Sequence, residues 1–352
     1  MKQSVTTLLM ECHTKHNTRE MPWKGVKDPY KIWLSEVILQ QTRVDQGMSY
    51  YERFVQNYPS IKDLATAKDE AVFKLWEGLG YYNRCKNLLF TARFITDNYG
   101  GKFPTEYDEI VALKGVGPYT AAAIASFAFN MPFAVVDGNV FRVLSRLFAI
   151  DTPIDSTIGK QQFTALAQEV LDKENAGLFN QAIMDFGATV CKPVNPQCNT
   201  CHLQKICVGY SKAVVNKLPV KEKVLLKKNR WFYYFLLECE GKILVEKRVL
   251  KDIWENLYEF YLLESNEQLS WDDTTVKDWL FQQLGIEKAT VSAISTLQKQ
   301  QLTHQLIKGQ FIKVSLDSIP NNLKHHQWYP INELKDLAFP KFINQFLDEN
   351  QV

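Results

Sequence analysis

The chain has 352 residues, of which 46% are hydrophobic, so it is long enough for two domains that each bury a core. Its formal net charge of +2 neither requires nor excludes a polyanionic partner, so any basic surface must be local. No run of 18 apolar residues and no basic head followed by an apolar stretch occurs, which excludes a membrane anchor and predicts a cytoplasmic protein.

Apolar residues recur three and four positions apart over residues 1–208, which predicts an all-α first domain. Early in it, Asp28 can cap a helix that has Pro29 in its first position and Glu36 on an apolar face. Burial there favours a protonated carboxyl group, which suits a general acid. The alternative is an exposed glutamate on a surface helix.

A glycine-rich turn over residues 113–120 joins two helical patterns. Gly115 and Gly117 suit a tight turn, and Pro118 suits the first position of the second helix. Backbone N–H groups would then point outward at a helix start, where a phosphate can bind. The turn predicts a helix-hairpin-helix motif, against the alternative of an ordinary interhelical turn.

A second carboxylate, Asp137, follows an apolar run and precedes a predicted helix over residues 140–148. A helix start offers free N–H groups and a partial positive charge, so we expect Asp137 to be ionised, unlike Glu36. Such a pair suits cleavage of a glycosidic bond, in which one group protonates the leaving group and the other stabilises the sugar cation. The alternative is a plain helix cap.

Four of the seven cysteines lie in one short segment rich in proline and asparagine. They are Cys191, Cys198, Cys201 and Cys207. Four thiolates can hold one tetrahedral zinc ion or one 4Fe-4S cluster, and the residues alone leave both open.

The pattern changes after the cysteine segment. Residues 209–229 are rich in lysine and predict a basic interdomain linker. Residues 230–352 predict a smaller α+β domain. Its expected strands cover 231–239, 242–246, 258–263, 290–297, 301–308 and 310–316, and its expected helices cover 271–284, 331–337 and 341–349.

Several motifs together closely resemble the MutY-type adenine DNA glycosylases of the endonuclease III superfamily. They are residues 33–37, 40–44, 76–84, 136–140 and 142–146, with the cysteine spacing. The resemblance covers nearly all of residues 3–207. It implies a helix-hairpin-helix glycosylase domain with a 4Fe-4S cluster, acting as a nucleoid-associated monomer on double-stranded DNA. It also implies that adenine paired with 8-oxoguanine or guanine is flipped out of the duplex and excised.

The resemblance assigns roles to individual residues. Glu36 would protonate adenine at N7, and Asp137, supported by Tyr119 and Asn139, would stabilise the sugar cation. Tyr119 stands where bifunctional members have a Schiff-base lysine, which implies a monofunctional enzyme. The implied adenine pocket and DNA wedge are Trp23, Leu39, Gln41, Tyr81 and Gln181, and the implied DNA-backbone contacts are Lys114, Gly115, Val116 and Gly117. Lys24 departs from the arginine common in the family.

The second domain resembles the Nudix-like domain of MutY proteins, which probes the base opposite adenine. Thr303 and His304 align with the loop that reads 8-oxoguanine, although they also suit ordinary strand positions. The helix expected over 271–284 lacks the clustered glutamates that bind magnesium in Nudix hydrolases, so we expect no pyrophosphatase activity.

Two other functions compete with this interpretation. One is a bifunctional glycosylase and lyase similar to endonuclease III, against which Tyr119 and the extra domain argue. The other is a non-catalytic DNA-binding protein that carries an iron–sulfur cluster, in which both acidic residues would be incidental.

Overall fold

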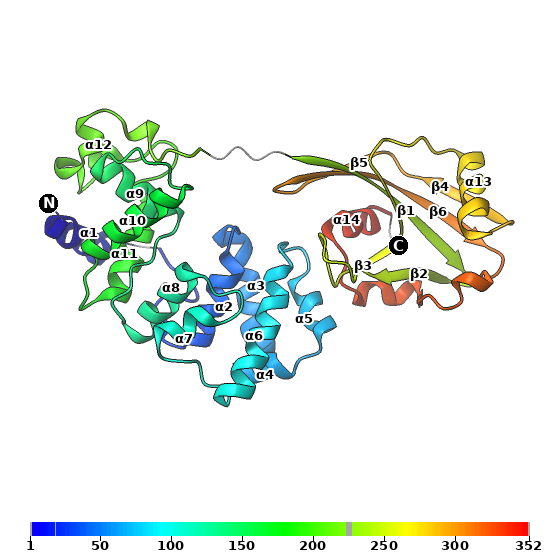
Figure 1. Cartoon of the computed structure of the whole chain (residues 1–352), viewed down its shortest axis with the longest axis horizontal. Coiled ribbons are helices and arrows are strands. Elements are labelled where there is room, and N and C mark those ends of the chain that lie inside the picture. The colour runs from blue at the N-terminus through cyan, green and yellow to red at the C-terminus, as the bar shows by residue number, and fades with distance from the viewer. Residues whose placement is uncertain (1, 18, 223–226, 351–352) are drawn as a thin grey trace. The chain divides into compact units, whose positions relative to one another are not determined.

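The computed structural model describes residues 2–17, 19–222 and 227–350. The chain divides into two compact units, which are described separately below (Figure 1). Unit 1 consists of Met1–Thr66 and Lys86–Lys223, and unit 2 of Ala67–Cys85 and Val224–Val352. The division does not follow chain order, because a segment from the middle of the first predicted domain belongs to the second unit.

The regular elements described in unit 1 are helical, as predicted. The α-helices are α1 (Lys2–His16), α2 (Pro29–Leu39), α3 (Val44–Asn57), α4 (Ile61–Thr66), α6 (Asn83–Tyr99, which begins in unit 2), α7 (Tyr107–Ala112), α8 (Pro118–Phe129), α9 (Gly138–Phe148), α10 (Thr157–Val170), α11 (Ala176–Thr189) and α12 (Val208–Ser211). Short 3-10 turns cover Cys198–Thr200, Gln204–Ile206 and Val215–Lys217. Within the described residues, none of the helices combines the length and the apolar character that crossing a membrane requires.

The predicted helix starts at the site are confirmed by their caps. The Asp28 carboxylate accepts a hydrogen bond of 2.9 Å from the Tyr30 backbone N–H, and Pro29 opens α2. Pro118 opens α8, and the Asp137 carboxylate accepts from the backbone N–H of Val140 at the start of α9. Each cap satisfies an N–H group that the helix itself leaves unpaired.

A core cluster of unit 1 joins α1, α9, α10 and α11. Phe163 on α10 and Phe179 on α11 are fully buried in it, and Phe141 meets Phe163 edge to face. Burial of each such side chain contributes about 1.5–3 kcal/mol. This rigid core carries the start of α9 and the exposed face of α11, which both reach the site described below.

Residues 209–222 belong to unit 1 and pack against it, and residues 228–229 of the predicted linker begin β1. Gly209 packs so closely on α9 that an added Cβ would lie 2.4 Å from the Arg146 carbonyl oxygen. Leu218 is buried, and the Ile154 backbone N–H donates to the Val220 carbonyl. The basic linker predicted over 209–229 is therefore packed against unit 1 from Gly209 to Val220. Its residues 223–226 lie outside the described part of the chain.

Unit 2 contains a mixed sheet with the strand order β4-β6-β1-β3-β2-β7, in which β5 pairs with β6. The strands are β1 (Lys228–Cys239), β2 (Lys242–Lys247), β3 (Tyr258–Ser265), β4 (Ala289–Ile294), β5 (Gln298–Gln301), β6 (Gln305–Leu316) and β7 (Trp328–Pro330). The helices are α5 (Asp69–Trp76), α13 (Asp273–Leu284) and α14 (Lys341–Asn350), with 3-10 turns at Asn321–Leu323 and Ile331–Asp336. The β1–β6 pair is parallel.

Side chains that alternate along β1 pack on the two faces of this sheet. Tyr233 and Phe235 contact Trp271 beside α13. Tyr234 faces the other side, where it contacts Phe342 of α14. The predicted α+β domain is confirmed, with one helix on each face of the sheet.

Several of the elements predicted for unit 2 differ from the structure. Residues 305–308 of the strand expected over 301–308 and the strand expected over 310–316 form the single strand β6, because Gly309 lets β6 approach β1: an added Cβ would lie 2.2 Å from the Phe232 carbonyl oxygen. Residues 302–304 form the turn before β6, and β5 was not predicted. The helix expected over 331–337 is a 3-10 turn, and β7 was not predicted. Three-residue edge strands such as β7 leave too short a pattern to detect.

The segment Ala67–Cys85 is tied to the rest of unit 2 by polar contacts. The Lys74 ammonium donates to the Leu337 carbonyl at 2.8 Å, and the Phe339 backbone N–H donates to the Glu77 carboxylate at 2.8 Å. Lys247 forms an ion pair with Glu70. No sequence pattern marks this packing, because the contacts join positions more than 170 residues apart.

Candidate active site

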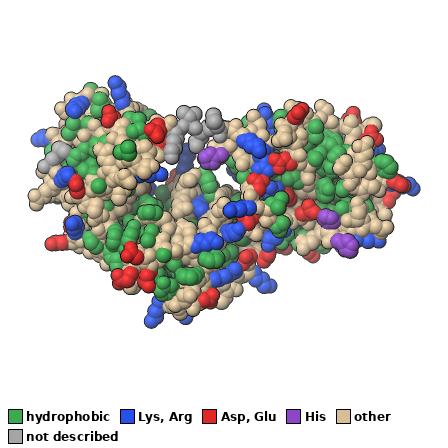
Figure 2. All heavy atoms as spheres, viewed as in Figure 1, with side chains coloured by type: hydrophobic (Ala, Val, Ile, Leu, Met, Phe, Trp, Pro, Cys, Tyr) green, Lys and Arg blue, Asp and Glu red, His purple; other side chains and the backbone are tan. Residues whose placement is uncertain are grey.

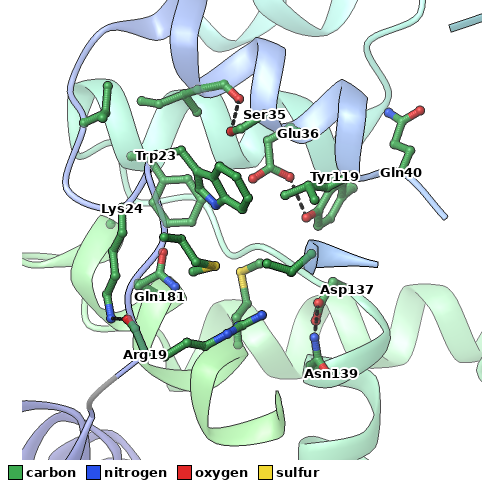
Figure 3. A pocket seen from close by; sticks show the side chains of 18 of the residues that line it. Arg19, Trp23, Lys24, Ser35, Glu36, Gln40, Tyr119, Asp137, Asn139 and Gln181 are labelled. Carbon is green, nitrogen blue, oxygen red and sulfur yellow. Dashed lines mark hydrogen bonds between the residues drawn. The ribbon is translucent and has the colours of Figure 1, made fainter. Parts of the chain in front are cut away.

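A cavity of about 600 Å³ in unit 1 is lined by α2, the start of α8, the start of α9, α11 and the loop after α1 (Figure 3). Eight residues predicted for catalysis, the base pocket or the wedge line this one cavity. They are Trp23, Glu36, Leu39, Gln41, Tyr119, Asp137, Asn139 and Gln181. The structure thus brings together positions that are up to 158 residues apart in the chain, from Trp23 to Gln181.

Glu36 lies on the buried face of α2, with 7% of its surface exposed. Burial raises its pKa to about 7, the Tyr119 hydrogen bond opposes that rise, and the negative charge of Asp137 adds to it. The Tyr119 hydroxyl donates to Glu36 Oε2 at 2.6 Å. A carboxyl group with this pKa is partly protonated near neutral pH, as predicted for a general acid.

Asp137 is held more tightly, at the start of α9. Its Oδ1 accepts from the Val140 backbone N–H at 2.7 Å, and its Oδ2 accepts from the Asn139 amide at 2.6 Å. Burial nevertheless raises the pKa of Asp137, and these hydrogen bonds oppose the rise. The prediction that the helix start alone would separate the two acids was wrong, because both are desolvated. They differ in their donors: Asp137 has a backbone amide and a side-chain amide, whereas Glu36 has one hydroxyl.

Of the two predicted supports of Asp137, the structure shows one. Tyr119 was expected to support Asp137, but its hydroxyl bonds to Glu36 instead. Asn139 does bond to Asp137, and Arg142 in turn donates to the Asn139 side-chain oxygen at 2.7 Å and to the Gly187 carbonyl at 2.7 Å. Arg142 lies in the motif of residues 142–146, but its contact with Asn139 joins side chains that only the fold brings together with Gly187.

The opposite wall of the cavity comes from the loop after α1 and from α11. Trp23 is 9% exposed and meets Tyr51 edge to face, with ring centroids 5.3 Å apart. Arg19 and Lys24 also line the cavity, and the Lys24 ammonium donates to the Arg19 carbonyl at 2.8 Å. No role was predicted for Arg19, because an irregular loop has no periodic pattern from which its direction could be read.

The predicted helix-hairpin-helix motif is formed by α7, the turn at Lys114–Gly117, and α8. Gly115 has φ +80°, and an added Cβ would lie 2.7 Å from Asn87, so a larger residue would displace the turn. Lys114, Gly115 and Gly117 are exposed, whereas the Val116 side chain is buried, so only the backbone of Val116 can face a ligand.

Gln41 and Tyr81, the predicted wedge residues, both adopt the left-handed backbone region, with φ 56° and φ 50°. Such conformations are uncommon for residues other than glycine and cost about 1–3 kcal/mol when they are strained. Gln41 is exposed at the rim of the cavity in unit 1, and Tyr81 is 44% exposed in unit 2. Each residue is thus presented to solvent by a fixed turn.

Thr303 and His304 lie in the turn that joins β5 to β6. The Thr303 hydroxyl hydrogen bonds to the Tyr81 hydroxyl, and the His304 carbonyl accepts from the Lys228 backbone N–H at 3.0 Å. The turn therefore brings a predicted reading residue into contact with a predicted wedge residue of the same unit. The His304 side chain is exposed.

The four clustered cysteines line one small, apolar cavity in unit 1. Burial, with a smaller contribution from negative charge on the other cysteines, raises the pKa of Cys201 to about 11. The buried Arg146 places Nη1 3.5 Å from Cys191 Sγ and also donates to the Lys192 carbonyl. Among the described residues, no three His, Cys, Asp or Glu side chains are arranged to hold one metal ion. Four thiols beside a fixed cation suit a centre that needs several thiolates.

The face of the molecule shown in Figure 2 carries side chains of both charges. On the face shown in Figure 2, lysine and arginine side chains are interspersed with aspartate and glutamate in both units. This agrees with the net charge of +2. With a net charge this small, affinity for a polyanion depends on local basic groups such as Lys114 of the hairpin.

Comparison with known proteins places this site in a family. Residues 34–171 match the HhH-GPD superfamily base excision DNA repair protein model, and residues 233–349 match the NUDIX domain model. The chain is 32% identical over 349 residues to an adenine DNA glycosylase of Buchnera aphidicola subsp. Schizaphis graminum, covering 97% of each chain. It is 43% identical over 198 residues to the adenine DNA glycosylase of Homo sapiens, covering 54% of this chain and 36% of the human protein.

A solved structure supports the fold of the helical part. A thermostable thymine-DNA glycosylase matches with a TM-score of 0.56 and 29% identity, covering 60% of this chain and 97% of that one. The likeness to the Buchnera protein spans both units from end to end. The chain therefore belongs to the MutY-type adenine DNA glycosylase family of base excision DNA repair enzymes.

Proposed function

We propose that this protein removes adenine from duplex DNA where it is paired with 8-oxoguanine or guanine, by hydrolysis of the N-glycosidic bond. The observation that carries the proposal is the pair of desolvated acids in one cavity, Glu36 with a pKa of about 7 and Asp137 with its own hydrogen-bond donors. The relatives named adenine DNA glycosylase support the choice of base.

In the first step, the Glu36 carboxyl group gives its proton to N7 of the flipped adenine. The bond between C1′ and N9 then breaks, and its electron pair leaves with the base. Tyr119 keeps the Glu36 carboxyl group oriented through its 2.6 Å hydrogen bond. A buried acid is needed because an exposed glutamate would have lost its proton at neutral pH.

In the second step, the ionised Asp137 stabilises the positive charge that develops on the sugar. Its contacts with Val140 and Asn139 favour the ionised form against desolvation. Water then adds at C1′ and loses a proton to the Glu36 carboxylate, which restores the starting state. Tyr119 offers no amine for a Schiff base, so we infer that the enzyme is monofunctional.

The cysteine loop would hold a 4Fe-4S cluster through Cys191, Cys198, Cys201 and Cys207. A bound cluster would cross-link the loop and add no chemistry to base release. Arg146 would offset the negative charge of the thiolates and fix the backbone of the loop. Iron and sulfide analysis tests this proposal: about four irons per chain support it, and one zinc per chain contradicts it.

In unit 2, the turn that carries Thr303 would read the base opposite adenine. The Thr303 hydroxyl can donate to or accept from a base edge. The hairpin turn at Lys114–Gly117 would bind a DNA phosphate, and Gln41 and Tyr81 would hold the duplex open. Each of these roles follows from family resemblance and agrees with the exposure of the residue concerned.

The test is release of free adenine from duplexes that contain A opposite 8-oxoguanine, A opposite guanine, or A opposite thymine. Excision from the first two and not from the third supports the proposal. The proposal fails if protein that contains its metal centre releases no adenine from any of these duplexes. Borohydride trapping on the same duplexes excludes the bifunctional alternative if no covalent product forms.

A further inference from the structure

Asp185 is a buried carboxylate on α11 that the proposed mechanism does not use. Only 3% of its side chain is exposed. Its Oδ1 accepts from Arg19 at 2.9 Å, and its Oδ2 accepts from the Asn17 amide at 2.7 Å and lies 3.1 Å from the Lys24 ammonium. These contacts, with one from Gln181, hold the pKa of Asp185 below its usual value although burial opposes them. Asp185 is therefore ionised in the folded protein.

These contacts connect two elements of the base pocket. Gln181 lies one helical turn before Asp185 on α11 and faces the same side. Arg19 and Lys24 lie on the loop after α1, and this loop also carries Trp23. Figure 3 shows Arg19, Trp23, Lys24 and Gln181 together on the wall opposite Asp137. One carboxylate thus fixes the loop against the helix.

The same carboxylate balances charge at this wall. Arg19 and Lys24 bring two positive charges to the pocket, and His13, whose Nδ1 lies 3.9 Å from Asp185, would add a third if it were protonated. In the proposed reaction the bound base itself becomes protonated. Uncompensated cations on the wall would oppose that step, because like charges destabilise each other in a desolvated site.

We propose that Asp185 is a positioning residue of the base pocket. It fixes Arg19, Lys24 and Gln181 as one wall, and its charge offsets the two cations so that the bound base can accept a proton. The inference rests on the proposed adenine excision and adds a specific requirement to it. In this proposal Asp185 acts through the wall residues and does not itself contact the base.

A double-mutant cycle tests the charge balance. Removal of Asp185 leaves the buried charges of Arg19 and Lys24 uncompensated beside the base, so we expect Asp185→Asn to slow single-turnover adenine release about 30-fold. Lys24→Met alone should slow it about 3-fold, whereas Lys24→Met added to Asp185→Asn should restore about 5-fold by removing an uncompensated cation. The matched control is Asp151→Asn, an exposed aspartate, which should change nothing.

Whether Lys24→Met raises or lowers the excision rate of the Asp185→Asn variant separates a positioning role from general structural damage. If Lys24→Met slows the Asp185→Asn variant as it slows the wild type, or if Asp185→Asn excises adenine normally, the inference is overturned. If the wild type itself releases no adenine, the proposed function fails instead. Asp185→Glu keeps the charge and moves it by one methylene group, so it should fold even where Asn does not, and it should keep the charge balance while losing the geometry.

His13 gives a readout that needs no DNA. Burial and Lys24 lower its pKa, and Asp185 raises it. Its titration, followed by NMR in the full-length protein, should shift to lower pH in Asp185→Asn, to higher pH in Lys24→Met, and little in Asp185→Glu. An unchanged His13 pKa in Asp185→Asn would show that the carboxylate does not control the charge of this wall and would overturn the inference.

Discussion

The base pocket of unit 1 and the Thr303 turn of unit 2 are built in different ways. In the pocket, each acid is desolvated and fixed by a neighbouring side chain: Tyr119 holds Glu36, and Asn139 holds Asp137. In the turn, Thr303 is half-buried with one side-chain contact to Tyr81, and His304 is exposed. Proton transfer needs a shifted pKa, which burial provides, whereas reading a base edge needs only an accessible hydrogen-bonding group.

This difference predicts two kinds of mutational effect. Changes in the pocket alter pKa values and geometry at the reacting atoms, so they should change the rate by orders of magnitude. Changes in the turn remove one hydrogen bond to an unreacting base, so they should change discrimination by a small factor. The experiments below test this contrast, from the largest expected effect to the smallest.

The largest effect should come from Glu36→Gln, which keeps the shape of the side chain and removes the transferable proton. We expect adenine release to slow by about 10³-fold or more, since a general acid contributes about 10²–10⁴-fold. Single-turnover excision measures it, with the exposed Glu109→Gln on α7 as the control. More than a tenth of wild-type activity in Glu36→Gln would show that another group protonates the base.

The same substitution should stabilise the protein at alkaline pH. The folded pKa of Glu36 is about 7, above its ordinary value of 4.5, so ionisation is disfavoured in the folded state. Wild-type stability should fall as pH rises from 4.5 to 7 and then level off, and Glu36→Gln should avoid a loss of about 3 kcal/mol at pH 8. Urea unfolding at pH 5 and pH 8 measures this. An equal stability change at both pH values would contradict the desolvated site.

A substitution outside the cavity should also slow the reaction. Gly187 packs on the start of α9, and an added Cβ would lie 2.6 Å from the Asn139 Cβ. Gly187→Ala should therefore displace Asn139 from Asp137 and slow excision about 30-fold, because small displacements of catalytic groups are costly. Ala188→Ser, on the same turn of α11, is the control. Normal rates in Gly187→Ala would show that this packing does not position Asp137.

The sequence predicted the pocket better than it predicted the charges within it. Caps and apolar spacing placed Glu36 and Asp137 at the correct positions of α2 and α9, because those signals are local. The pKa of Asp137 and the partner of Tyr119 depend on burial and on contacts between distant helices. Local pattern carries no information about either, so the prediction that the two pKa values would shift in opposite directions was wrong.

The same limit applies to unit 2 and to the pocket wall. Gly309 looked like a break between strands because a glycine usually interrupts a strand, yet it marks a close approach of β6 to β1. The packing of Ala67–Cys85 with the C-terminal part joins positions far apart in the chain. Asp185 had no motif of its own, although its spacing of four from Gln181 shows that the two share a helix face.

The smallest effect should come from Thr303→Val, which replaces the hydroxyl with a methyl group of similar size. Loss of one hydrogen bond to the opposite base should reduce the preference for 8-oxoguanine over guanine about 3- to 10-fold and leave release of adenine opposite guanine nearly unchanged. Single-turnover rates on the two duplexes measure the ratio, with the exposed Thr290→Val on β4 as the control. If Thr303→Val slows both duplexes equally, the turn supports general DNA binding rather than reading. In that case substitutions in the pocket and in the turn would both change the rate of excision, and the two regions would differ only in how large that change is.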